Sequence, residues 1–382
     1  MRTVSYRPYL LLMLFFFGVL SLPLATGERL RAGVVCSFAP IWQGLHVLKE
    51  KSLFLCYALP PSASNGGEQE HLEQENLLLR SQMENVREWL LSEGRIHEQA
   101  ERLKAIRADA GASDFAKRRS KELAQAIDLQ ASALPARVIF RDPASWSSVL
   151  WINIGERDNA AVGKKVVAKH SPVIYGTSII GVVEYVGQAQ SRVRLITDAR
   201  LNPSVRVVRG GEQNRFLMEH LESLIFALEK REDLFSSEGE AHSLALQLSR
   251  LRGAIAQQSG DLYLAKGELH GSSHPLWRSR SQVLKGVGFN CDFADEEGPA
   301  RDLRTGEPYH LYGKEPLALI TQGDLLVTTG FDGVFPAGFR IAQVSSVQTL
   351  KEGASSYEIE AIPTAGNLNE LIHISVLPAL KS

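Results

Sequence analysis

The sequence predicts a mainly β protein in which an N-terminal transmembrane helix and a coiled-coil helix precede two small β-barrel domains with a helical and loop insertion. Three observations predict this architecture. The chain opens with an uncharged apolar stretch, continues with a proline-free segment carrying a leucine repeat, and then shows short strand-like runs separated by Gly, Asp and Pro. Strands at such close spacing are typical of small barrels and not of alternating βαβ units.

The composition sets the broad class. The chain has 382 residues, and at about 150 residues per domain this length suggests two or three folding units. Apolar residues make up 44%, which is enough to form real cores, so a wholly disordered chain is excluded. The 42 basic residues balance 43 acidic ones, so the charge gives no indication of a nucleic-acid partner.

Residues 9–27 are expected to form a transmembrane helix behind a short cytoplasmic tail at 1–8. No charged residue occurs between Pro8 and Gly27, and a helix of that length spans about 30 Å, the thickness of a bilayer core. The alternative is a cleaved signal peptide whose apolar core ends near Leu22. The residues after Leu22 form a poor small-x-small cleavage site, which favours a retained anchor. Arginines on both sides leave the orientation open by charge, and export of the large body is the simplest arrangement.

Residues 28–67 form a juxtamembrane segment and linker that ends in a Pro-, Ser- and Gly-rich stretch at 60–67. Cys36 and Cys56 both lie in this segment. Either Cys36 and Cys56 form a disulfide after export, in which case Cys291 has no cysteine left to pair with, or they are small buried or free thiols. Three cysteines are too few for a disulfide framework.

Residues 68–134 are expected to form a coiled coil. No proline occurs between Pro61 and Pro135, and apolar residues recur there at alternating four- and three-residue steps. The seam consists of Leu72, Asn76, Leu79, Met83, Val86 and Leu90. An amphipathic helix folded onto the body is the alternative. Asn76 either sets the register of the coiled coil or is a solvated polar residue in a loose seam.

Short strand-like runs begin after Pro135 and predict a first barrel at 135–210. This barrel can also include strands from the C-terminal part of the chain. A second barrel and C-terminal strands are expected at 317–382. Between them, residues 211–316 read as an insertion that is partly helical and partly loop. Its helical part shows one apolar stripe, which consists of Leu217, Leu221, Leu224, Ile225 and Leu228.

The sequence predicts no catalytic residue, no cofactor and no metal site. Two barrels raise the question of a chymotrypsin-like protease, whose triad needs Ser, His and Asp. Leu325 follows Gly323 and Asp324 where the serine should stand, and no histidine occurs between His170 and His220. Other histidines and Cys291 match no usual zinc spacing.

Several sequence motifs, taken together, resemble those of one family, the rod shape-determining protein MreC. They are Val138 to Trp146, Trp151 to Asp158, Ser191 to Asp198, and Gly323-Asp324 followed by Val327 to Gly338. The resemblance covers about 1–210 and 317–378 in order. The motif residues are Asp142, Pro143, Trp146, Gly155, Asp158, Asp198, Gly323, Asp324, Gly330, Gly333, Pro336 and Gly338.

The resemblance implies a single-pass protein of the bacterial inner membrane with the bulk of its chain in the periplasm. Family members are non-catalytic scaffolds that maintain cell shape by organising peptidoglycan synthesis in the elongation machinery. The implied partners are MreD, MreB, RodZ and the elongation-specific transpeptidase, together with further copies bound through the coiled coil and the β domains. The implied body has two six-stranded barrels.

The chain departs from the family pattern at three places. The usual Asp-Gly-Val turn is replaced by Asp158-Asn159-Ala160, Ala342 stands where a glycine is usual, and the insertion at 211–316 has no counterpart. That insertion puts in doubt any partner surface at the start of the second barrel.

Most motif residues suit a structural role, since glycines at turns accept a positive φ or a close backbone approach. Phe331, Phe335 and Phe339 recur at four-residue steps and are either an apolar partner contact or core, with core packing favoured. Two other functions stay open: an exported two-barrel hydrolase-like protein, and a periplasmic adaptor of a transport complex. The missing nucleophile argues against the first. A single long helix ahead of the barrels, in place of a helical hairpin, argues against the second.

Replacing Asn76 with Leu should tighten the coiled coil or change its order, because a polar residue at an a position limits both. Sedimentation of the full chain in detergent measures the mass of the assembly. An unchanged mass and an unchanged dissociation midpoint would show that the seam is not a coiled coil.

Overall fold

The computed structural model describes residues 99–100, 103–104, 114–142, 145–229, 238–256, 261–271, 282–291, 318–350, 354 and 356–380. The chain divides into two compact units, Met1–Met83 and Glu84–Ser382, and every described residue belongs to the second. The transmembrane helix expected at 9–27, the linker at 28–67 and the heptad positions 72–90 lie outside the described residues. Among the helices of the described part, none combines the length and apolar character that crossing a membrane requires.

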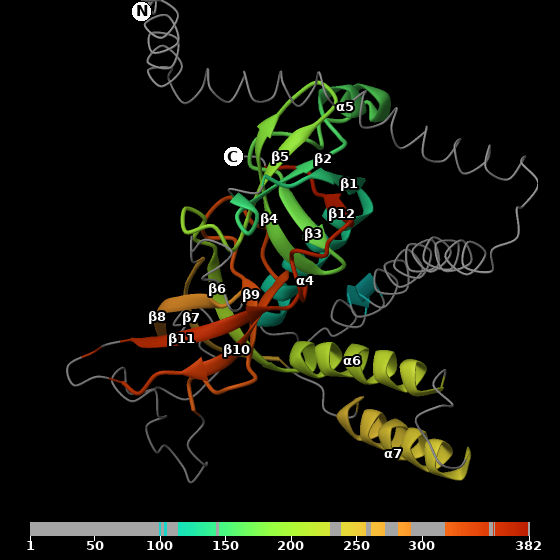
Figure 1. Cartoon of the computed structure of the whole chain (residues 1–382). Helices are drawn as coiled ribbons and strands as arrows, with labels where there is room; N and C mark the ends of the chain where they lie inside the picture. Colours follow the sequence, from blue (N-terminus) through green and yellow to red (C-terminus); the bar gives the residue numbers. More distant parts are fainter. Residues whose placement is uncertain are drawn as a thin grey trace, which may run out of the picture. The chain divides into compact units, whose positions relative to one another are not determined.

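Six strands close into a first barrel (Figure 1). In order around the ring they are β4 (Ser178–Val186), β3 (Pro172–Tyr175), β12 (His373–Val376), β1 (Leu134–Phe140), β2 (Val149–Ile152) and β5 (Ser191–Leu195), which pairs back onto β4. Strand β12 comes from the far end of the chain, and its Val376 lies opposite Leu134 of β1 and Val173 of β3. The first barrel is therefore complete only when the C-terminal strand has returned to it.

Six further strands close into a second barrel. In order they are β11 (Tyr357–Pro363), β8 (Leu284–Cys291), β7 (Asp261–His270), β6 (Ser204–Gly210), β9 (Leu325–Thr328) and β10 (Arg340–Val347), which pairs back onto β11. Every pairing within this ring is antiparallel. A single parallel bridge between Arg340 of β10 and Ser178 of β4 joins the two barrels.

The segment 211–316, expected to be helix and loop, supplies two strands of the second barrel. Strand β7 pairs with β6 over most of its length, and β8 pairs with both β7 and β11. Strand β6, placed by the sequence at the end of the first barrel, belongs to the second, whereas β12 belongs to the first. The pairing partners lie far apart in the chain, and local alternation of apolar residues carries no information about them.

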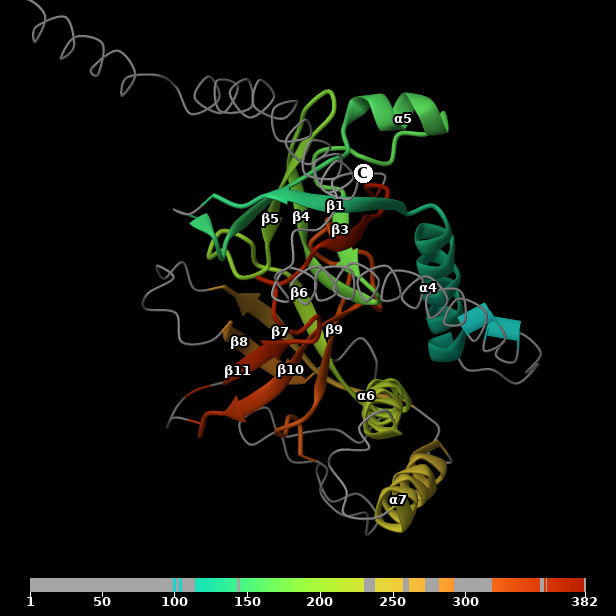
Figure 2. The same cartoon turned by 45° about the vertical axis from the view of Figure 1, so that its right-hand side comes forward.

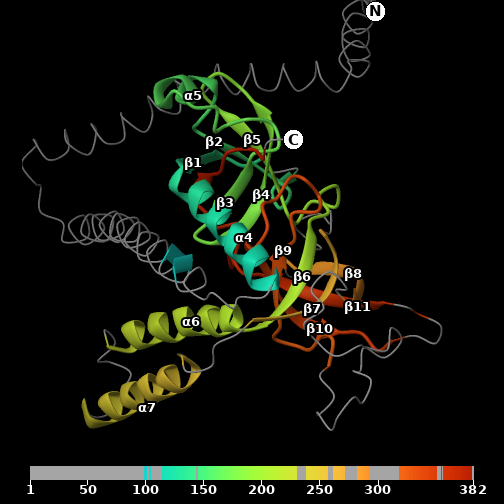
Figure 3. The same cartoon turned by 180° about the vertical axis from the view of Figure 1, so that it is seen from behind.

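Two helical features flank the barrels. Helix α4 (Asp114–Ala131), within the range 68–134 expected for the coiled coil, runs directly into β1, and its Ala126 and Leu129 pack on the core. Figure 3 shows α4 passing from the first barrel toward the second. The short helix α5 (Glu156–Val162) follows β2. Helices α6 (Gly211–Glu229) and α7 (Glu238–Ala256) follow β6 and precede β7 along the chain. They lie side by side, and beyond the first turns of α6 they point away from the strands (Figures 1 and 2).

One hydrophobic core runs through both barrels. It includes Ile180 and Val193 of the first barrel and Leu326 and Ala361 of the second, all fully buried. A smaller cluster on the outer face of the second barrel consists of Val208, Leu325 and Val327, with Phe216 of α6 and Tyr263 of β7 packed against it. The second cluster fixes the first turns of α6 against the sheet.

Replacing Gly338 with Val should destabilise the second barrel by about 1–3 kcal/mol, because a β-branched residue is strained at positive φ. Gly338 has a φ of 87°, and no atom within 4 Å would block the new Cβ, so the backbone conformation alone is tested. Gly253→Ala on α7 is the control, since that helical position is equally open and Ala favours a helix. Melting of Gly338→Val at the parent temperature would refute the prediction.

Replacing Leu217–Ala256 with a short Gly-Ser linker should keep both barrels folded, because Gly210 and Asp261 lie opposite each other at the open end of the β6–β7 pair. Removing Asp261–Cys291 instead should abolish cooperative unfolding, since β7 and β8 would be lost from the ring. Chemical denaturation of the two deletion variants measures this difference. Equal loss of cooperativity in both would show that the α6–α7 hairpin is integral.

Candidate partner-binding surface

The loop between β9 and β10 separates the three phenylalanines that the sequence groups together. Phe335 and Phe339 are buried and belong to the common core. Phe331 is 64% exposed, the largest exposed fraction among the large apolar side chains of the described part. The four-residue step does not put them on one face, because the loop turns at Gly330 and Gly333, both with positive φ.

Asp332 holds this loop in one shape. Its Oδ1 accepts hydrogen bonds from the backbone N–H of Val334 and Phe335, both at 2.9 Å, and its Oδ2 accepts one from Ser204 N at 3.1 Å. The N–H of Phe331 donates to Thr329 Oγ1 at 3.2 Å. The exposed ring is thus presented by a fixed backbone, which lowers the entropy cost of using it in binding.

Cationic side chains alternate with aromatic rings along the outer face of the second barrel beside Phe331. Lys266 Nζ lies 5.5 Å from the centroid of the Phe331 ring, and Arg206 Cζ lies 5.9 Å from the same centroid. The same Arg206 carbon is 5.5 Å from the Tyr263 ring, over which Arg119 of α4 stacks at 3.4 Å. Burial is the main cause that raises the pKa of Tyr263, so its ring stays neutral.

This cation–aromatic row connects α4 to the exposed loop through β7 and β6. Such contacts contribute about 0.5–2 kcal/mol each depending on desolvation. Nothing in the sequence pattern singles out Arg206, Tyr263 and Lys266 as site residues. Two of them stand in β7, inside the segment assigned to the insertion, where the apolar run Leu262 to Ala265 before Gly267 was the one available signal.

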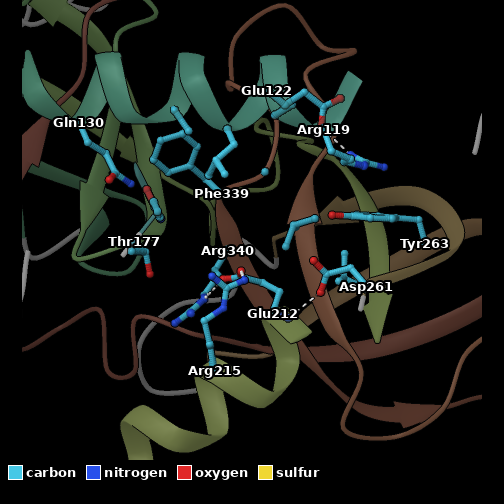
Figure 4. Close-up of a pocket in the computed structure, with 17 residues that line it drawn as sticks. Arg119, Glu122, Gln130, Thr177, Glu212, Arg215, Asp261, Tyr263, Phe339 and Arg340 are labelled. Carbon is cyan, nitrogen blue, oxygen red and sulfur yellow. Dashed lines mark hydrogen bonds and ion pairs between the residues drawn. The ribbon is translucent and has the colours of Figure 1, made fainter. Parts of the chain in front are cut away.

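A cavity of about 220 Å³ opens between α4, the start of α6, β7 and β10 (Figure 4). Its floor is an ion network centred on Arg340, whose Nε donates to Glu212 Oε1 at 2.9 Å and whose Nη1 donates to Glu219 Oε2 at 2.7 Å. Arg215 also pairs with Glu212. Burial lowers the pKa of Arg340, but the two carboxylates raise it more, so the guanidinium stays charged.

The cavity lies between α4 and the second barrel, and charged side chains stand on both of its walls. On the wall formed by α4, Arg119 pairs with Glu122, while on the opposite wall Asp261 Oδ1 accepts the N–H of Glu212 at 2.6 Å and fixes the start of α6. No group of three or more His, Cys, Asp or Glu side chains in the described part could hold a metal ion.

Asp158, Asp198 and Asp324, three acidic motif residues, make hydrogen bonds or ion pairs within the protein. Asp324 is buried and receives two hydrogen bonds from Arg209, from Nε at 2.8 Å and Nη2 at 2.6 Å. Asp158 Oδ2 accepts Gly155 N–H at 2.7 Å, and Asp198 is buried beside Arg200. The Asp324–Arg209 pair ties the β9 end to β6 and was not predicted.

The remaining motif residues shape turns. A Cβ on Gly155 would lie 2.3 Å from Gly187 O, so only glycine fits that approach. Gly323 has a φ of 88°. The carbonyl of Pro336 accepts a hydrogen bond from Thr328 Oγ1. Asp142 and Trp146 are half-buried, and Trp146 begins the turn that leads into β2. Pro143 lies outside the described residues, as do all six predicted coiled-coil positions.

Comparison with protein families gives one match. The model described as "Rod shape-determining protein MreC, barrel core" matches residues 138–257 and 295–378, just over half of the chain. The match passes over 258–294, which contains β7 and β8 and lies within the range expected for the insertion. No curated protein matches the chain.

Several solved structures are similar to this chain. MreC from Pseudomonas aeruginosa is 19% identical, with 64% of this chain and 97% of that chain covered and a TM-score of 0.36. MreC from Listeria monocytogenes is 19% identical, with 75% and 96% covered and a TM-score of 0.38. A chain of the complex between penicillin-binding protein PBP2 and MreC from Helicobacter pylori is 12% identical to this chain. The match covers 65% of this chain and 98% of that chain, with a TM-score of 0.32.

Proposed function

Because the chain belongs to the MreC family of rod shape-determining proteins, which are non-catalytic structural proteins, we propose that it is a membrane-anchored periplasmic scaffold of the bacterial cell-wall elongation machinery. In this role it maintains cell shape by organising the enzymes that synthesise peptidoglycan. The observation that carries the proposal is the family match, which covers 138–257 and 295–378 and so includes strands of both barrels.

The proposed anchor is the uncharged segment 9–27, which holds the body on the periplasmic face of the inner membrane. The proposed self-association site is the seam Leu72, Asn76, Leu79, Met83, Val86 and Leu90, together with the β domains. The anchor and the seam lie outside the described residues, and both rest on the sequence pattern and the family.

The proposed partners are MreD, MreB, RodZ and the elongation-specific transpeptidase. The structure of an MreC from Helicobacter pylori in complex with PBP2 supports the transpeptidase. We assign Phe331 as the contact within the loop 330–338, because it is exposed and held rigidly, whereas Phe335 and Phe339 are core residues. An aromatic ring on a fixed loop has the properties of an interface hot spot.

Co-purification from crosslinked cells, with a tag placed after Leu380, tests the function. The intact chain should recover wall-elongation proteins, including the transpeptidase, and should keep its own amino terminus. A recovered chain that begins near Gly27 without such partners would contradict the proposal and reopen the hydrolase-like alternative.

Phe331→Ala should weaken recovery of the transpeptidase, with a loss of binding free energy of about 1–2 kcal/mol if the ring is a hot spot. Ile362→Ala is the matched control, because Ile362 is another exposed apolar residue of the same barrel, at 52%. Affinity measured with the two purified proteins decides the question. Equal losses in both variants would show that the loop is not the contact.

A further inference from the structure

The α6–α7 hairpin is the most apolar exposed feature of the described structure. Of thirteen large hydrophobic side chains exposed there, five lie on these two helices: Leu217, Leu224, Phe226, Leu246 and Leu251. No described side chain of either helix is buried. Helices that stand in water with this much apolar surface are typical of a surface that another protein covers.

Both helices carry the same apolar repeat at steps of four, three and four residues. On α6 it consists of Leu217, Leu221, Leu224 and Leu228, and on α7 of Leu244, Leu248, Leu251 and Ile255. This spacing places each set on one line of its helix and is the spacing used in helix bundles. Within these lines Leu217, Leu224 and Leu251 remain 47–49% exposed, while the other members are partly covered.

Helices α6 and α7 contact each other, so we infer that the neighbouring helix covers one flank of each leucine line, while among the described residues the half-exposed members leave the other flank open. The ion pair between Glu222 and Arg252, with 3.3 Å between Oε1 and Nη1, lies off both lines and links the helices. His220 and Gln247 lie next to the open flank, Glu240 lies one turn before Leu244 at the start of α7, and neither line includes an Asp, Glu, Lys or Arg. Two identical leucine lines of this kind can therefore meet without like-charge repulsion along their length.

The area of this side fits a second hairpin better than a single helix. Two helices of 19 residues make a face about 28 Å long and about 20 Å wide, which is on the order of 500 Å² per copy. Contact between two such faces removes on the order of 1,000 Å² from water, the lower limit for a specific interface. A single helical segment would cover about half of the face and fall below this limit.

We propose that the open leucine side of the α6–α7 hairpin binds the same side of a second copy, so that two hairpins form a four-helix bundle. This contact is separate from the heptad seam at 72–90 and from the loop of Phe331. It goes beyond the proposed function and holds whichever wall proteins the scaffold contacts.

Single-cysteine crosslinking of the full chain in its membrane tests the contact. Cys36, Cys56 and Cys291 are first replaced by Ser, and Leu224→Cys, Leu251→Cys and Leu246→Cys are then made one at a time. Leu246 is the matched control, since it is 46% exposed and lies five residues from Leu251, about 140° around the same helix. A short bifunctional thiol reagent should crosslink the chain to itself at positions 224 and 251 several-fold more than at 246.

Equal crosslinking at all three positions would reveal only proximity and would overturn the proposal. An adduct with a different protein, or thiols at 224 and 251 that are unreactive in an uncrosslinked chain, would also overturn it. The first result indicates another partner, and the second indicates cover by a segment of the same chain. Recovery of wall proteins by the tagged chain does not depend on these results, so the two proposals fail separately.

A second measurement excludes an effect of the cysteines themselves. Leu224→Gln combined with Leu251→Gln should weaken self-association of the full chain in detergent about tenfold or more, because several half-buried leucines are lost from each interface. Leu246→Gln should leave it unchanged. Sedimentation over a range of protein concentrations gives both values, and equal behaviour of the two variants would contradict the proposal.

Discussion

Closure of both β-sheets is the constraint on which the rest of the structure depends. Every strand of the two rings has a neighbour on each side, so neither barrel presents a row of unpaired backbone groups to a passing strand. Closure makes the two barrels interdependent along the chain. Strand β12 joins the first barrel only after the chain has passed through every strand of the second barrel. Strands β7 and β8, which complete the second barrel, come from the long segment between β6 and β9. The common core through Phe335 and Phe339 continues this coupling inside.

With the sheet edges closed, a partner cannot add a strand to either barrel, and contact surfaces arise from loops, helices and the outer faces of the strands. The polar network of the described part serves to hold these parts in place. Asp332 fixes the loop that exposes Phe331, and Arg340 with Glu212 and Glu219 fixes the root of α6. Because these buried or half-buried charges pair within the protein, removing Arg340 would take an ion-pair partner from both carboxylates at once and would destabilise the root of α6. Their role is to position apolar groups, which suits a scaffold better than an enzyme.

The sequence predicted which local elements occur better than it predicted which strands pair with one another. Strand texture, glycine turns such as Gly338 and the leucine stripe of α6 follow from local periodicity, and these features appear where the pattern placed them. The assignment of β6, β7 and β12 to their barrels depends on pairings between distant residues, which periodicity does not encode. The same limit applies to the candidate site. Phe331, Phe335 and Phe339 look equivalent in the sequence, and only the turn geometry separates one exposed ring from two core residues.

The register of the second barrel places the two exposed apolar features at opposite ends of it. Strands β6 and β9 are antiparallel, with Val205 opposite Thr328 and Val208 opposite Leu325. The hairpin leaves the barrel after Gly210, beyond the C-terminal end of β6, whereas Phe331 follows the C-terminal end of β9, next to the start of β6. A partner at one end therefore does not compete with a partner at the other. In the two proposals, one copy of the chain holds a second copy through its hairpin and a wall enzyme through its loop at the same time, which is the property that organising an assembly requires.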